Sequence, residues 1–500
     1  MRSFFRGIGL RRCVAAVALL PVLWVLRPAP ARAYDPATTH AGLTERAVLA
    51  SKLNHILASR LGKPLGLFET VGFDLSQLPR PEARRLKERL FALDPAQGYR
   101  PSDDGSATAL SWVVAGAVLS GTPAERARHT FFDPARQRGL QQGRGAIAFG
   151  NAVRQFLDEG GSPRGLATGS SFDLTGQPAP EWLLSPENDV GLAVFYDQWE
   201  QAVAAAEPAA RAAALARALL ALGGTLAVLE DAGEPAHVRN DFTDAYLDGG
   251  SGVFDRSSAY ERFVAETYGR GGVPAPGPAI DRPNVRAFFS APDAQGLADR
   301  TQRRFFSPGS LPDDAVVERD TSAHDVLLQA RESLPYGWPR LPRLQLRAIG
   351  RLEYARSSDG IEMLGGHPRR LLAYTRVPGR VRFFLDSAVY ADSARVLLPE
   401  IGAYAAGLVD HLFRAELSLA VSGGTVTMTI AGPRGSLRNA RCQMFAEDQV
   451  GHRVVIATRP CNLDAPLSAS VPPGTRRVAA TLRGEDDAGP LVANAESLVH

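Results

Sequence analysis

The most constraining feature of the chain is a long Ala/Leu-rich run that leads into LEDAGEPAHVRNDF, within residues 222–242. We expect a helix to enter this stretch with Asp231 at its end, because Gly233 and Pro235 break helices. His237 follows six residues after Asp231. An acid and a histidine around a helix-ending turn can point into one space, and both are good zinc ligands. The simpler alternative is a helix-end acid and a loop histidine, since short motifs often match by chance.

Up to about residue 414, apolar residues recur mainly at helical spacing. The pattern predicts helices after residue 39 and over residues 76–95, 107–119, 144–158, 189–222, 257–269 and 387–413. The segment 107–119 is apolar throughout, which is typical of a buried helix. The sequence therefore predicts a mainly α chain over residues 34–414.

From Glu416 the pattern changes to short β-branched or alternating runs separated by turn signals. This pattern is typical of an all-β sandwich, which we place at residues 415–500. Cys442 and Cys461 can form a disulfide in an oxidising compartment. Phe445 is the only aromatic residue after Glu416, so the sandwich offers no aromatic cluster for stacking on sugars.

The first 33 residues have the features of a signal peptide. Arginines precede an apolar run at residues 13–26, which is too short to span a bilayer. The small residues at 31–33 predict cleavage after Ala33, leaving Tyr34 as the mature N-terminus. We therefore expect a secreted or periplasmic protein with no transmembrane segment after cleavage.

The charge balance does not favour a polyanionic partner such as a nucleic acid. Lys and Arg number 56 against 53 Asp and Glu, for a net charge of +3. A chain this close to neutrality is not expected to form a stable nucleic-acid complex. The sequence leaves the oligomeric state open.

Four segments in order, THAGLTERA, HTFFDP, LEDAGEPAHVRND and SAYERFVAE, resemble the zinc-dependent phospholipase C and single-strand-specific nuclease superfamily. The resemblance covers most of residues 34–414. It implies a largely helical fold with a cleft that holds three zinc ions and hydrolyses phosphate esters. In that family, an aromatic N-terminal residue contributes its amine and carbonyl to one zinc.

The resemblance implies a set of metal ligands in this chain. Asp231 matches the acid that bridges two metals, and the other matching positions are Tyr34 as the N-terminus, His40, His129, His237 and Glu261. Without the resemblance, each histidine could equally be a structural residue rather than a metal ligand, and Glu261 could be a charged side chain exposed to solvent.

Three positions of the family pattern are altered. Ala227 and Ser257 stand where the family has histidines, and Ser120-Gly121 stand where it has an acid that is also a candidate general base. Only the group of Tyr34, His40 and Asp231 then keeps all its ligands, so we expect one to three zinc ions and assign no catalytic residue. One of three nearby acids could fill a vacant position: Asp241, Asp244 or Asp248.

The leading hypothesis is a secreted zinc-dependent phosphoesterase with reduced activity. Its substrate would be a phosphodiester, either a phospholipid or a nucleotide. The competing hypothesis is a catalytically inactive metal-binding or surface-binding protein that kept the fold. A third is a sandwich that binds carbohydrate, lipid or a partner, with the helical domain as its scaffold. The missing ligands favour the second hypothesis, and the retained order of motifs favours the first.

Overall fold

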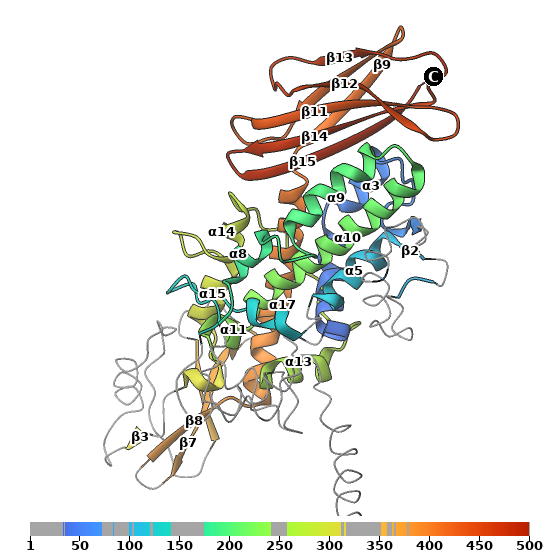
Figure 1. Ribbon diagram of the computed structural model, residues 1–500. Coiled ribbons are helices and arrows are strands. Elements are labelled where there is room, and N and C mark those ends of the chain that lie inside the picture. Colours follow the sequence, from blue (N-terminus) through green and yellow to red (C-terminus); the bar gives the residue numbers. More distant parts are fainter. Residues whose placement is uncertain are drawn as a thin grey trace, which may run out of the picture.

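The chain forms a helical domain followed by a C-terminal β-sandwich (Figure 1), which confirms the predicted fold class. The structure is a computed structural model that describes residues 34, 36–72, 84, 100–102, 105–120, 124–141, 175–241, 258–311, 315–316, 352–357, 363–364, 367–377 and 380–499. The predicted signal peptide and the helix predicted over 144–158 lie outside the described residues, as does all but residue 84 of the helix predicted over 76–95.

Helices make up most of the described part of the first domain. Those described are η1 (Pro36–His40), α2 (Ala41–Ala50), α3 (Leu53–Arg60), η2 (Gly66–Phe68), α5 (Ala109–Leu119), η5 (Ala124–His129), α8 (Ala179–Leu184), α9 (Leu192–Ala204), α10 (Pro208–Glu230), η6 (Asp231–Gly233), α11 (Pro235–Arg239), α13 (Ala259–Tyr268), α14 (Val285–Phe289), α15 (Leu297–Arg304), η7 (Pro308–Ser310) and α17 (Ser387–Leu412). The predictions for the segments that became α2, α5, α13 and α17 are confirmed.

The single helix predicted over residues 189–222 is wrong. Two helices occupy this region, because α9 ends at Ala204 and α10 begins at Pro208. Proline has no backbone N–H and a fixed φ, so it is accepted in the first turn of a helix but not in its interior. Helix α10 then continues past residue 222 to Glu230, which places Asp231 at its C-cap as predicted.

Helix α10 is the centre of the helical core and packs closely against α5. A Cβ atom on Gly223 would lie 1.8 Å from Val113 O, and one on Gly116 would lie 1.9 Å from Leu220 O. The two helix backbones therefore come into close contact at a glycine of each helix. The segment Pro208–Gly233 is long and apolar enough to cross a membrane, but 89% of its most apolar window is buried inside the fold.

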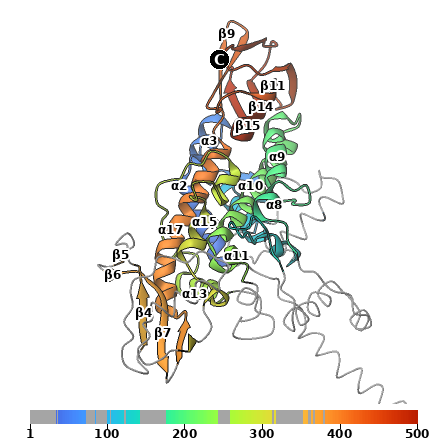
Figure 2. The same ribbon diagram turned by 90° about the vertical axis from the view of Figure 1, so that its left-hand side faces the viewer.

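A small antiparallel sheet lies in the helical domain, and the sequence analysis did not predict it. Its strand order is β3 (Ala315–Val316), β8 (Arg380–Phe384), β7 (Arg370–Val377) and β4 (Leu352–Arg356). Helix α17 packs against β7. Figure 2 shows that α17 runs from this sheet at one end of the domain to the sandwich at the other. Two further short pairs lie among the described residues of the domain: β1 (Thr70–Gly72) with β2 (Ser106–Thr108), and β5 (Met363–Leu364) with β6 (His367–Pro368).

The sandwich consists of two antiparallel sheets. One has the order β13 (Leu467–Ser470), β10 (Thr425–Ala431), β9 (Glu416–Ser422), and the other has the order β12 (Arg453–Pro460), β11 (Arg438–Glu447), β14 (Arg477–Asp486), β15 (Gly489–Leu498). Alternate side chains of both sheets form one apolar core. Cys442 and Cys461 are joined by a disulfide, with 5.3 Å between their Cα atoms, so the predicted bridge is confirmed.

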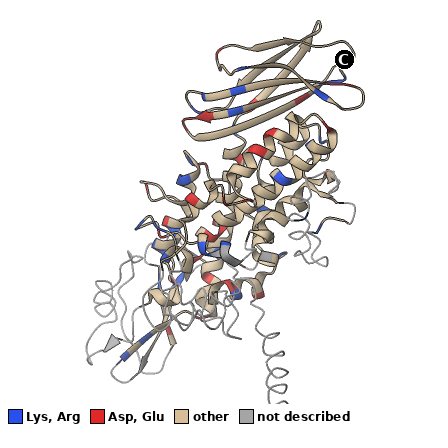
Figure 3. Cartoon of the chain, viewed as in Figure 1, with Lys and Arg blue, Asp and Glu red and all other residues tan. Residues whose placement is uncertain are grey.

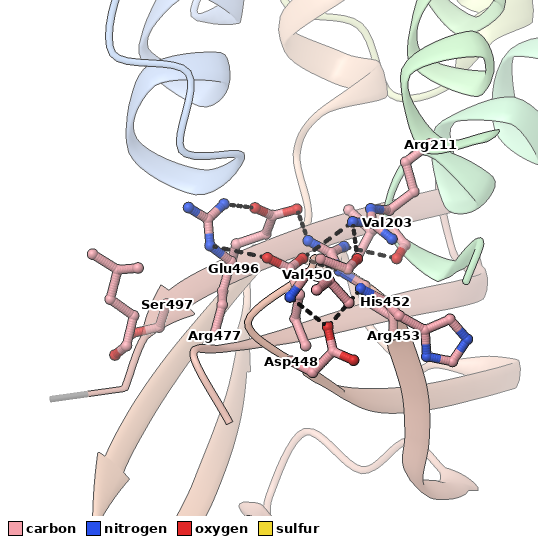
Figure 4. A network of polar contacts seen from close by, with 12 residues as sticks. Val203, Arg211, Asp448, Val450, His452, Arg453, Arg477, Glu496 and Ser497 are labelled. Carbon is pink, nitrogen blue, oxygen red and sulfur yellow. Dashed lines mark hydrogen bonds and ion pairs between the residues drawn. The ribbon is translucent and has the colours of Figure 1, made fainter. Parts of the chain in front are cut away.

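The sandwich docks on the helical domain through apolar and charged contacts. Phe445 is buried in the core that α9 and α10 also share, so it offers no surface for stacking. Arg453 is 4% exposed and donates to Val203 O of α9 at 2.8 Å. The same guanidinium pairs with Glu447 and Glu496 at 2.7 Å each (Figure 4). Elsewhere, charges of both signs are scattered over the two domains (Figure 3).

Candidate metal centre

The C-terminal end of α10 meets the start of α2 deep inside the helical domain. His40 and Asp231 are each 2% exposed, and His40 Nε2 lies 3.1 Å from Asp231 Oδ1. Two atoms bound to one zinc at about 2.0–2.2 Å and near-tetrahedral angles lie roughly 3.4 Å apart. His40 and Asp231 therefore have the spacing of two ligands of one ion, which is also the spacing of a simple ion pair.

The other ring nitrogen of His40 is held by Glu230. His40 Nδ1 lies 2.6 Å from Glu230 Oε2, and Thr44 Oγ1 donates to Glu230 Oε1 at 2.7 Å. Burial by itself would lower the pKa of His40, but Asp231 and Glu230 outweigh burial and raise the pKa to about 10. Burial raises the pKa of Glu230, against the hydrogen bonds from His40 and Thr44.

A second group of buried ligand-type residues joins the end of α10, α11 and α13. Glu234, His237 and Glu261 each offer one ligand atom, and these atoms all lie within 4.8 Å of one another. His237 Nε2 is 3.8 Å from Glu261 Oε1. All three residues are no more than 3% exposed. A carboxylate, an imidazole and a second carboxylate form a donor set that zinc accepts.

His237 is held so that one ring nitrogen faces this group. Its Nδ1 lies 3.1 Å from Thr130 Oγ1, and its ring stacks on Phe131 with 4.2 Å between ring centroids. Burial lowers the pKa of His237 to about 4 although Asp231 attracts its proton. The imidazole is therefore neutral at pH 7, as a metal ligand must be.

Both glutamates of the second group also cap helices. Glu234 accepts a hydrogen bond from His237 N at 2.8 Å and one from Ser258 Oγ at 2.8 Å. Glu261 accepts from Ser258 N at 2.6 Å and closes the capping box of α13. Capping alone explains why acids stand at these two positions, since a good cap contributes about 1 kcal/mol.

The donor atoms of the whole centre suit a bound cation. The carboxyl groups of Glu230, Asp231, Glu234 and Glu261 are buried near the imidazoles of His40 and His237. Asp231 Oδ1 is a buried atom for which the described residues supply no hydrogen bond of acceptable geometry. Carboxylate oxygens and imidazole nitrogens are donor atoms that zinc accepts. The residues therefore fit a divalent metal ion.

Tyr34 lies next to both groups. Its ring packs edge-on against His40, with 5.7 Å between centroids, and its hydroxyl donates to Gly233 O at 3.2 Å. Tyr34 is fully buried, and burial raises the pKa of its hydroxyl well above 10. The structure thus brings five of the six predicted ligands into one region: Tyr34, His40, Asp231, His237 and Glu261.

His129 is the sixth predicted ligand, and it has other contacts. Its ring stacks on Trp182 with 4.1 Å between centroids. Gln177 N donates to Nδ1 at 3.0 Å, and Arg128 Nε donates to Nε2 at 3.1 Å. A metal on His129 would have to displace one of these donors. Burial and then Arg128 lower the pKa of His129 to about 4, and its role as a ligand stays a prediction.

The structure describes two of the altered positions, Ala227 and Ser120. Ala227 is buried in α10, one turn before Asp231. Ser120 is the C-cap of α5, and its hydroxyl donates a hydrogen bond to Ala117 O of the same helix at 2.7 Å. Gly121 and Ser257 lie outside the described residues, as do Asp244 and Asp248. Asp241 accepts a hydrogen bond from Gly309 N at 2.6 Å and is not part of the group formed by Glu234, His237 and Glu261.

Sequence reasoning missed Glu230 and Glu234. Both stand in the stretch LEDAGEPAH that the sequence analysis singled out. Glu234 precedes His237 by three residues, and a Glu-x-x-His spacing on a helical turn is a recurrent metal-binding pattern. That signal could have identified Glu234. No comparable spacing points to Glu230, because its partner His40 is 190 residues away in the chain.

Comparisons with known proteins give little independent information. No family model matches the chain, and no curated protein sequence matches it. Among solved structures, the crystal structure of Clostridium perfringens alpha-toxin from an avian strain aligns with 94% of this chain and 100% of that chain. The identity is 8% and the TM-score is 0.19, and a similarity this low carries no argument.

Proposed function

We propose that the protein is an exported, zinc-binding hydrolase of the phosphoesterase type, with activity below that of a relative with a complete ligand set. The observation that carries the proposal is the pair of adjoining groups of buried histidines and carboxylates at the end of α10. The order of the sequence motifs supports the same family. The substrate class is a phosphodiester, either a phospholipid or a nucleotide.

Two sets of residues would hold zinc. His40 and Asp231 would form one set, joined by the amine and carbonyl of Tyr34 if export cleaves the chain after Ala33. Glu234, His237 and Glu261 would form the other, with Glu234 in place of the histidine that Ser257 replaces. Bound zinc lowers the pKa of a water molecule and stabilises negative charge on phosphoryl oxygens.

The proposed reduction in activity follows from the protein's own groups. Ser120 cannot accept a proton as a carboxylate base does, and its hydroxyl is bonded to Ala117 O. General base catalysis typically contributes about 10²–10⁴-fold. Ala227 supplies no donor atom, which leaves a metal near Asp231 with fewer ligands.

A second candidate function is metal binding without catalysis. The burial of the ligand-type residues favours it, because His40, Asp231, Glu234, His237 and Glu261 are each no more than 3% exposed. A catalytic zinc needs one position open to substrate, whereas a structural zinc is closed. The two candidates agree on the ligands and differ in turnover.

Zinc stoichiometry with an activity assay on the same sample tests the proposal. The protein is stripped with a chelator and reloaded, and zinc per mole is measured for the wild type, Glu234→Gln and Asp231→Asn. Each variant is expected to lose about one equivalent. Asp299→Asn is the matched control, because Asp299 is a buried acid that caps α15 and its hydrogen bonds go to Ser290, Ala291 and Gly296, none of which belongs to this centre. Loss in the control as large as in the variants would mean that the acids act only as caps.

Turnover of a phosphodiester by the zinc-loaded protein separates the two candidates. We expect slow hydrolysis that rises in a variant carrying Ala227→His, Ser257→His and Gly121→Asp. No hydrolysis by either protein would leave metal binding as the function. N-terminal sequencing of the exported protein tests the role of Tyr34: a start at any other residue removes the terminal amine from the ligand set.

A further inference from the structure

Glu230 makes two hydrogen bonds that the proposed ligand sets do not require. It is the last residue of α10 and is fully buried. One carboxylate oxygen faces His40 Nδ1 at 2.6 Å, and the other accepts from Thr44 Oγ1 at 2.7 Å. His40 and Thr44 are four residues apart at the start of α2, so both lie on one face of that segment. Glu230 therefore fixes this face of α2 against the end of α10.

The direction of these bonds determines which nitrogen of His40 is available. A carboxylate only accepts hydrogen bonds, so His40 Nδ1 carries a proton that it donates to Glu230. Nε2 faces Asp231 at 3.1 Å, and a metal ion bound there would replace the proton that Nε2 shares with Asp231. Glu230 and Asp231 are adjacent in the sequence but contact different nitrogens of His40. Glu230 contacts Nδ1, and Asp231 contacts Nε2.

We propose that Glu230 is a positioning residue for metal binding, which orients His40 through Nδ1 and leaves Nε2 as the ligand atom beside Asp231. This inference rests on the proposed function. Histidines that bind metals almost always donate their other N–H to a carboxylate, a carbonyl or water, and removal of that partner typically weakens metal binding about 10–100-fold. Glu230 also adds a negative charge next to the ion.

The alternative role for Glu230 is purely structural. A buried ion pair between Glu230 and His40 would hold α2 to α10 whether or not a metal binds. Thr44 provides the matched control, because it bonds the same carboxylate without touching the ligand atom. Thr44→Val removes one buried hydrogen bond from Glu230, whereas Glu230→Gln removes the charge and leaves an amide of nearly the same size.

The test is zinc affinity by competition with a chromogenic chelator, measured in a Glu234→Gln background so that the His40 group is observed alone. Glu230→Gln is expected to weaken zinc binding about 10–100-fold and Thr44→Val less than about 3-fold, although both lower the thermal stability of the metal-free protein. Glu230→Asp, which keeps the charge, is expected to fall between the wild type and Glu230→Gln. Equal affinities in Glu230→Gln and the parent, or equal losses in Glu230→Gln and Thr44→Val, would overturn the proposal.

A measurement on the unmutated residues keeps the proposal testable if Glu230→Gln does not fold. In the zinc-loaded wild type, ¹⁵N NMR of the imidazoles is expected to show His40 protonated at Nδ1 and metal-bound at Nε2. Protonation at Nε2 would overturn the role of Glu230 and leave the proposed function standing. A wild-type protein that binds no zinc would overturn the proposed function and this inference together.

Discussion

His411 makes the junction of the two domains sensitive to acid. It lies in the last turn of α17, just before the sandwich, and is 2% exposed. Within the described part of the chain, neither of its ring nitrogens has a hydrogen-bond partner, and the ring packs against Phe288. Two arginines, Arg414 and Arg434, act on it more strongly than Asp281 and Asp486 do. A proton on His411 is therefore unfavourable in the folded protein.

Burial, followed by these arginines, lowers the pKa of His411 to about 4 from an ordinary value of 6.5. The unfolded chain takes up the proton first, so the free energy of unfolding falls as the pH drops from 6.5 towards 4. At 1.36 kcal/mol per pKa unit, this one residue removes roughly 2–3 kcal/mol of unfolding free energy by pH 4.5 and almost none at pH 7.

His411→Leu tests this magnitude. Leucine has a similar volume and no polar atom to leave unsatisfied, so we expect little change in stability at pH 7. Urea unfolding of the variant and the wild type at pH 7.0 and 4.5 measures the difference in acid sensitivity. The variant is expected to lose roughly 2–3 kcal/mol less unfolding free energy than the wild type between these two pH values. The exposed His55 provides the control His55→Gln, which is expected to match the wild type. Equal losses in wild type and His411→Leu would refute the reasoning.

Three further predictions concern stability. Gly223→Ala should lower the free energy of unfolding in urea melts by at least about 2 kcal/mol, because the added Cβ would clash with the backbone of α5. Gly271→Ala is the control and should cost little, because nothing lies within 4 Å of the added Cβ. Similar costs in both variants would mean that α5 and α10 move apart freely. Replacing Cys442 and Cys461 by serine should cost about 3 kcal/mol, and two reactive thiols in the unfolded, unreduced wild type would contradict the bridge. Arg453→Leu should cost about 3 kcal/mol by leaving buried acids with less positive charge, and a change below 1 kcal/mol in the same melts would contradict that role.

The pattern change at Glu416 also suggests that the sandwich folds independently, which we state here as a prediction. Phe445 and Val492 of the sandwich belong to the core of the helical domain, and Arg453 bonds Val203 O across the junction. An isolated fragment of residues 415–500 would expose these groups. We therefore expect it to be less stable than the sandwich in the whole chain.

Local sequence patterns identified several elements without help from tertiary structure. The apolar run of α5, the long helix α17 and the change to alternating strands at Glu416 depend on periodicity, which neighbouring residues determine. The signal for the helix break before Pro208 is also local, because proline is not accepted in the interior of a helix. The sequence contained that signal, and the prediction of one helix overlooked it.

The small sheet of β3, β8, β7 and β4 and the composition of the metal centre were decided by tertiary structure. Strands β4 and β7 are separated by further chain and become a sheet only when they pair and pack on α17. Glu230 acquires its role from His40, and Glu234 acquires its role from Glu261 on α13. Asp231 and His237 could be proposed as ligands from one short motif. Their partners could not, because a ligand set is a property of distances in space, and the chain brings these residues together only by folding.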